Sequence, residues 1–107
     1  MDKLLNEYIE LTAKEYYNKQ KDYSSFFNLL QKCRIGGYYY IGYFVGKILE
    51  KVNDWRFLDE LSICAYYIGE YKESYNLCEK ILNICPEKDK NRIKTNLIYS
   101  KRKMETK

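Results

Sequence analysis

Histidine is absent from this 107-residue chain, which also has only one proline and five glycines. Without histidine, the side chain used most often as a general base is missing. The scarcity of glycine and proline disfavours sandwiches and barrels, which need many turns. The four cysteines, Cys33, Cys64, Cys78 and Cys85, form no Cys-X-X-Cys pair. We therefore expect no catalytic constellation and no cofactor, and we interpret the cysteines as reduced, buried hydrophobes rather than as a zinc site.

Long hydrophobic runs are missing as well. The longest uncharged stretch, Ile35 to Gly46, is well short of the roughly 20 residues that a membrane-spanning helix requires. The N-terminal residues carry charges throughout and do not have the pattern of a signal peptide. We therefore expect a cytoplasmic, intracellular protein without a membrane partner.

Aromatic and charged residues, in contrast, are plentiful. Aromatic residues make up 17% of the chain, with 13 tyrosines, and charged residues make up 32%. This composition is typical of a globular protein rather than a disordered one. The length is sufficient for one domain.

Apolar residues recur at steps of three and four along most of the chain, which is typical of amphipathic helices. Gly36-Gly37 and Gly69 interrupt the pattern, and glycine readily adopts the left-handed conformation that ends many helices. The sequence thus predicts about six helices, over residues 3–20, 23–35, 38–52, 55–68, 71–84 and, after Pro86, 87–103.

The third predicted helix is apolar on most of its circumference, because Tyr40 and Phe44 widen its main stripe. A helix of this kind is usually central and buried. Its Gly42 and Gly46 form a GxxxG pattern. In a run too short to span a membrane, we interpret this pattern as the close approach of two helices.

An internal repeat relates the second and third helices to the fourth and fifth. A shift of 33 residues places Ile35-Gly36-Gly37-Tyr38 on Ile68-Gly69-Glu70-Tyr71, and Lys47-Ile48-Leu49 on Lys80-Ile81-Leu82. Because one helix pair cannot bury its apolar face alone, neighbouring pairs must stack. We predict a single domain, residues 1–107, with a half repeat (3–20), two repeats (22–53 and 54–86) and a terminal helix (87–103).

Paired helices with a period near 34 resemble the tetratricopeptide repeat. Ala65 departs from the aromatic residue of that family, and Asn53 stands in place of the closing proline in the first unit. The resemblance implies an all-α fold, an antiparallel helix-pair stack that forms an α-solenoid fragment. It is best in the second unit, at Leu58, Leu61, Ser62, Ala65, Gly69, Tyr71, Ser74, Cys78, Ile81 and Pro86.

A narrower resemblance is carried by the run from Asp54 to Gly69, together with Asn91-Arg92-Ile93 and Asn96-Leu97. These residues are similar to the helical segment that follows family-2 glycosyltransferase domains in some bacterial and large-virus proteins. The chain has neither a nucleotide-sugar domain nor a DxD motif. The resemblance therefore implies an accessory module of a glycosyltransferase system rather than a transferase.

In such a stack, the first helix of each pair lines the concave surface, and its residues off the core line are candidates for partner contact. Tyrosine and arginine are typical of binding hot spots. Phe26 and Leu30 on the second helix also lie off the core line. The alternative, in which candidate side chains complete the core of a short stack, applies above all to these two residues. The predicted contacts are Arg56, Asp59, Ile63, Tyr66 and Tyr67 on the fourth helix, and Tyr23 and Arg34 on the second.

Two charged features have simpler interpretations than a functional one. The carboxylates of Asp59 and Glu60 point about 100° apart on a helix and cannot converge on one substrate, so we expect a solvated face with Glu60 in a structural hydrogen bond. From Glu87 to Lys107 there are eight Lys or Arg residues against three acidic ones. A basic helix can bind phosphates, but Tyr99 is the one aromatic residue among these charges, and there is no nucleic-acid-binding motif. We therefore interpret this stretch as a solvated C-terminal helix, which argues against nucleic acid as a partner.

The leading functional hypothesis is a non-enzymatic protein-interaction scaffold that binds a partner peptide or helix on its concave face. The alternative hypotheses are the accessory glycosyltransferase module and, with less support, nucleic-acid binding through the basic C-terminal helix. Self-association through the end helices is a further expectation, because a short array leaves apolar faces at both ends.

Overall fold

The computed structural model describes residues 3–4, 6–8, 10–11, 24–50 and 54–106. All regular structure in these residues is helical, which confirms the predicted all-α class. The predicted first helix is helical over its described residues, whereas residues 12–20 lie outside the described part of the chain. The remaining elements are α2 (Ser24–Ile35), α3 (Tyr39–Leu49), α4 (Trp55–Tyr67), α5 (Tyr71–Leu82), the 3-10 turn η2 (Glu87–Asp89) and α6 (Lys90–Glu105).

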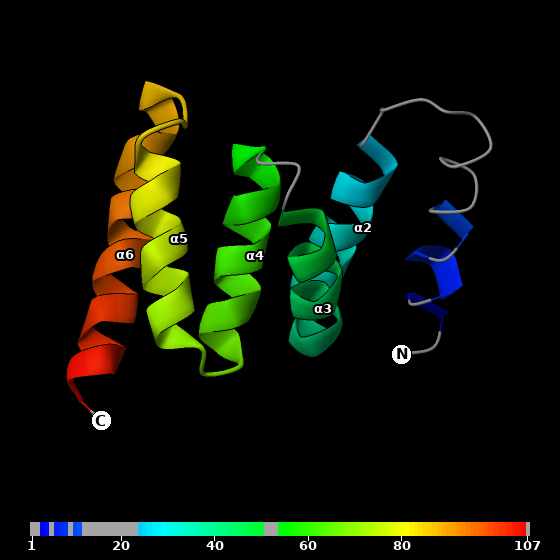
Figure 1. The fold of residues 1–107 in the computed structure, drawn as a ribbon, viewed down its shortest axis with the longest axis horizontal. Coiled ribbons are helices and arrows are strands. Elements are labelled where there is room, and N and C mark those ends of the chain that lie inside the picture. The colour runs from blue at the N-terminus through cyan, green and yellow to red at the C-terminus, as the bar shows by residue number, and fades with distance from the viewer. Residues whose placement is uncertain (1–2, 5, 9, 12–23, 51–53, 107) are drawn as a thin grey trace.

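The helices lie side by side along the longest axis of the molecule, with the N-terminal segment at one end and α6 at the other (Figure 1). From α2 onward, each α-helix packs against the next one along the chain, and α4 also packs against α2 and α6. The overall dimensions are 45 × 30 × 20 Å. Helix α4 is therefore the central element, and α2 and α6 flank it.

Two hydrophobic clusters hold these helices together, and α4 contributes to both. The first lies between α4, α5 and α6, and the second lies between α2, α3 and the start of α4. All four cysteines are buried and free, which confirms their prediction as small core side chains. Burying one large aliphatic side chain is worth about 1.5–3 kcal/mol. The fully buried members include Leu29, Leu30, Val45, Phe57, Leu58, Leu61, Ile81 and Ile93.

The backbone of α3 packs directly against α4. A Cβ atom added at Gly42 would lie 2.5 Å from Cys64 Sγ, and one added at Gly46 would lie 2.8 Å from Leu61 Cδ1. Both distances are far shorter than van der Waals contact, so neither position has room for a side chain. The GxxxG pattern thus marks the predicted close approach of two helices.

The expectation that the third helix is buried on most sides is wrong. Tyr40, Phe44 and Ile48 form an exposed apolar stripe, and no described helix covers it. The physical reason is that α3 buries a narrow face of Gly42, Val45, Gly46 and Leu49, which its two glycines press against α4. The wider apolar surface lies on the opposite side, toward solvent.

The turn between α2 and α3 has the same geometry as the turn between α4 and α5, but the interval between the two turns differs from the predicted one. Gly37 (φ 78°) and Gly69 (φ 91°) are 32 residues apart rather than 33. In each turn, the backbone N–H of the residue after the glycine donates to the carbonyl oxygen five residues earlier. Tyr38 N–H donates to Cys33 O at 2.8 Å, and Glu70 N–H donates to Ala65 O at 2.9 Å. The buried residues of α3 and α5 repeat at the same interval. The repeat boundaries, 22–53 and 54–86, stay a prediction.

Candidate binding groove

An open groove of about 670 Å³ lies over the face that α2, α4 and α6 share. This volume is within the usual range of ligand sites, about 300–1,000 Å³. Because α4 is central, it supplies the largest share of the lining. The lining residues are Phe27, Gln31 and Arg34 from α2; Tyr39 from α3; Trp55, Arg56, Asp59, Glu60, Ser62, Ile63, Tyr66 and Tyr67 from α4; Ser74 from α5; and Arg92, Asn96, Tyr99 and Ser100 from α6.

Six of the seven predicted contact residues line this one groove, namely Arg34, Arg56, Asp59, Ile63, Tyr66 and Tyr67. The seventh, Tyr23, lies outside the described residues. Phe26 and Leu30 are buried in the core instead, as their alternative interpretation has it. The lining shows where the six side chains lie, and their role in binding stays a prediction.

Sequence reasoning missed the contribution of α6 to the groove. Arg92, Asn96 and Tyr99 line it from this helix. Their spacing of four and three residues is the usual signal for one helix face. That signal was available in the sequence, but the excess of basic residues led to the whole helix being interpreted as a solvated terminal element.

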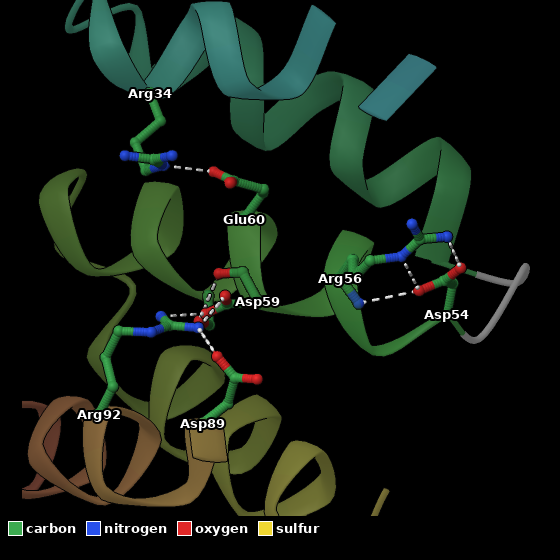
Figure 2. A network of polar contacts seen from close by, with 8 residues as sticks. Arg34, Asp54, Arg56, Asp59, Glu60, Asp89 and Arg92 are labelled. Carbon is green, nitrogen blue, oxygen red and sulfur yellow. Dashed lines mark hydrogen bonds and ion pairs between the residues drawn. The ribbon is translucent and has the colours of Figure 1, made fainter. Parts of the chain in front are cut away.

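Two arginine–carboxylate pairs among the lining residues join α4 to α2 and to α6 (Figure 2). Arg34 Nε on α2 donates to Glu60 Oε2 on α4 at 2.6 Å. Arg92 on α6 donates from Nη2 to Asp59 Oδ2 at 2.7 Å and from Nη1 to Oδ1 at 3.2 Å. A bidentate pair of this kind fixes orientation as well as distance. These pairs therefore position α2 and α6 on either side of α4.

The expected solvated face at these two carboxylates is wrong, because both side chains are buried beneath their arginines. The side chains of Glu60 and Asp59 are only 5% and 10% exposed. The predicted structural hydrogen bond of Glu60 is present, with Arg34 as its donor. Burial raises the pKa of the Glu60 carboxyl, and the hydrogen bond from Arg34 opposes that rise. Asp59 lines the groove, but its carboxylate oxygens are used by Arg92.

A third arginine lies at the N-terminal end of α4. Asp54 caps this helix by accepting a hydrogen bond from the backbone N–H of Arg56 at 2.9 Å. The Arg56 side chain also donates to both Asp54 carboxylate oxygens, and this lowers the pKa of Asp54. The guanidinium carbon lies 5.4 Å from the ring centroid of Phe27, within the range of a cation–π contact. Arg56 is thereby held beside the groove.

Aromatic rings line the groove at its other end. Tyr39 and Tyr67 stack with ring centroids 4.4 Å apart, and Tyr66 meets Tyr67 edge to face at 5.4 Å. Such contacts limit the freedom of the rings, so they lose little entropy when a ligand binds. Tyr67 is largely exposed and Tyr66 is half-buried, which leaves ring surface available to a ligand.

Three buried serines allow α4, α5 and α6 to approach closely at the base of the groove. Ser74 Oγ donates to the carbonyl oxygen of Ser62 at 2.9 Å and lies 2.9 Å from Ser100 Oγ. Each hydroxyl has a hydrogen-bonding partner, and none is paired with a base that would activate it as a nucleophile. We therefore interpret these serines as small packing residues.

Burial limits the reactivity of the thiols of α4 and α5. Burial raises the pKa of the thiols of Cys64 and Cys78 to about 12 and about 11, which keeps both protonated and weakly nucleophilic. Within the described ranges, no three His, Cys, Asp or Glu side chains gather where they could hold a metal ion. The helices of the described part are all too short or too polar to cross a membrane.

Comparison of the chain with protein-family models, with curated proteins and with solved structures gives no match, so the groove is interpreted from its own residues.

Proposed function

We propose that this chain is a non-enzymatic interaction module that binds a segment of a partner protein in the groove of α2, α4 and α6. The observation that supports this most strongly is the convergence of arginine and tyrosine side chains from four helices on one open surface. Arginine, tyrosine and tryptophan are the residues that most often dominate binding energy at protein interfaces. The groove contains Arg34, Arg56, Arg92, Tyr39, Tyr66, Tyr67, Tyr99 and Trp55.

Preorganisation also supports the proposal. The two ion pairs beneath the groove hold α2, α4 and α6 in place before any partner arrives. A surface that is already ordered loses less conformational freedom on binding, and the affinity for a given contact area is higher. A helix or an extended segment laid across α4 would contact all three helices at once.

The alternative role, as an accessory module of a glycosyltransferase system, rests on the sequence resemblance alone. It would use the same groove and differ in the identity of the partner. The buried, free thiols fit the reducing interior of a cell, and we place the proposed interaction there.

A selection from a displayed library of random 12-residue peptides tests the proposal. Each selected peptide is measured against the wild-type protein, against Ile63→Gln in the groove, and against Ile48→Gln on the outer face of α3 as a matched control. We expect peptides whose binding weakens at least tenfold with Ile63→Gln and less than twofold with Ile48→Gln. Circular dichroism establishes that both variants are folded. The proposal is wrong if no selected peptide depends on Ile63.

A further inference from the structure

The charged groups of the groove are arranged in two levels, with carboxylates below and guanidinium groups above. The side chains of Arg34, Arg56 and Arg92 are 33%, 54% and 46% exposed. The carboxylates of Glu60 and Asp59 are almost fully covered. A ligand in the groove therefore meets the arginines first, and the acidic groups lie behind them.

The charged groups of the groove leave mainly hydrogen-bond donors free. A guanidinium has five N–H donors. The bond to Glu60 uses one donor of Arg34, and the pair with Asp59 uses two donors of Arg92. Arg92 Nη2 also forms a longer ion pair with Asp89 Oδ1, at 3.6 Å (Figure 2). Both lining carboxylates, by contrast, already accept hydrogen bonds from these arginines. A ligand that satisfies the remaining donors must supply acceptors.

We propose that the partner segment is acidic, and that its Asp or Glu side chains bind the exposed edges of Arg34 and Arg92 while an apolar side chain contacts Ile63 and the tyrosines. This inference rests on the proposed function and adds the chemical class of the partner. Carboxylates are preferred to neutral acceptors because charge-assisted hydrogen bonds are roughly twice as strong, and arginine matches their geometry. The net charge of +4 also favours the approach of an acidic segment.

Asp59 and Glu60 compete with such a partner for the arginines. Each carboxylate neutralises part of the charge of one guanidinium from below, while the outer edge of that guanidinium faces the groove. The same carboxylates leave little net positive charge in the groove. This disfavours a phosphate backbone, which carries one negative charge per nucleotide, more than it disfavours a peptide with two acidic side chains.

The inference differs from the sequence prediction in the sign of one effect. If Asp59 contacts the partner directly, Asp59→Asn weakens binding. If Asp59 competes with the partner for Arg92, Asp59→Asn removes the closer of the two carboxylates that pair with Arg92, and binding of an acidic peptide becomes about three- to tenfold tighter. The double variant Asp59→Asn/Arg92→Gln has the same net charge as the wild-type protein and lacks the guanidinium. We expect it to bind the peptide at least tenfold more weakly than the Asp59→Asn variant does.

The test uses the library peptides whose binding depends on Ile63. Trp55 is the only tryptophan and lines the groove, so its fluorescence reports occupancy directly. We expect these peptides to carry two or more Asp or Glu residues. Replacing those residues by Asn or Gln in the peptide weakens binding to the wild-type protein at least tenfold. Arg102→Gln, an exposed change on the same helix, alters binding less than twofold.

Several outcomes overturn the inference. Ile63-dependent peptides without acidic residues, or peptides whose affinity survives the change to amides, contradict the acidic class and leave the proposed function standing. An absence of Ile63-dependent peptides contradicts both. Binding of a 15-nucleotide uridine oligomer that is lost in the double variant Arg34→Gln/Arg92→Gln shows that the groove binds phosphate, which also overturns the inference.

Discussion

Arg92 offers the most informative perturbation, because it joins α6 to α4 through the buried carboxylate of Asp59. Arg92→Met keeps an unbranched apolar stem, which is shorter than arginine, and removes both hydrogen bonds, at 2.7 and 3.2 Å. Asp59 then keeps a charge that is only 10% exposed. Removing one partner of a buried ion pair costs about 3–5 kcal/mol. Since Arg92 is almost half exposed, solvent screening reduces the expected loss to about 1–3 kcal/mol.

Urea unfolding followed by circular dichroism at 222 nm measures this loss. Arg102→Met is the matched control, because Arg102 is an exposed residue of the same helix, and we expect it to change stability by less than about 0.5 kcal/mol. Combining Arg92→Met with Asp59→Asn gives a double-mutant cycle, in which the neutral amide no longer needs a cation. We expect a coupling energy of about 1–2 kcal/mol between the two positions.

Two results would refute this reasoning. If Arg92→Met costs no more than Arg102→Met, the pair does not hold α6 in place. If the losses of Arg92→Met and Asp59→Asn add without coupling, the two side chains do not act on each other, and the geometry of the groove has another origin.

Three further predictions concern the rest of the fold. Gly42→Ala forces Cβ against Cys64 Sγ and destabilises by about 1–3 kcal/mol in urea unfolding, and Cys64→Ala added to it is expected to cost less than the sum of the single changes. Asp54→Ala removes the α4 cap and costs about 1 kcal/mol at pH 7, whereas Asp54→Asn costs less. Because the pKa of Asp54 is lowered in the folded state, this contribution is present above about pH 4 and declines as the pH falls below it, which unfolding at pH 3 and pH 7 compares. Iodoacetamide should modify Cys64 and Cys78 only at the rate of unfolding, as mass spectrometry over a urea series measures, and rapid labelling of native protein would contradict their burial.

The sequence was sufficient to predict the helices, because local signals set them. Apolar periodicity and the turn glycines place α2, α3, α4 and α5 within a few residues of their observed bounds. The repeat register failed by one residue because two adjacent glycines offer two alignments. Of Gly36 and Gly37, only Gly37 takes the left-handed conformation, and the sequence alone does not show which of the two does so.

The candidate groove was predictable on α4 and much less so elsewhere. Residues at helical spacing share a face whatever surrounds them, so Ile63, Tyr66 and Tyr67 could be grouped in advance. The role of Asp59 could not, because its partner Arg92 lies 33 residues away in sequence and reaches it only through the packing of α6 on α4. For the same reason, the exposed stripe on α3 was mistaken for core. An apolar residue shows that it can be buried, and the neighbouring helices determine whether it is.

The most direct test of the account is to locate a bound peptide on the protein. Isotope-labelled protein is titrated with a selected Ile63-dependent peptide, and amide chemical-shift changes are followed by NMR. We predict that the largest changes lie along the groove, in residues 31–34 of α2, 63–67 of α4 and 96–100 of α6. Changes confined to the outer face of α3, from Tyr40 to Ile48, would contradict the claim that the groove is the binding surface.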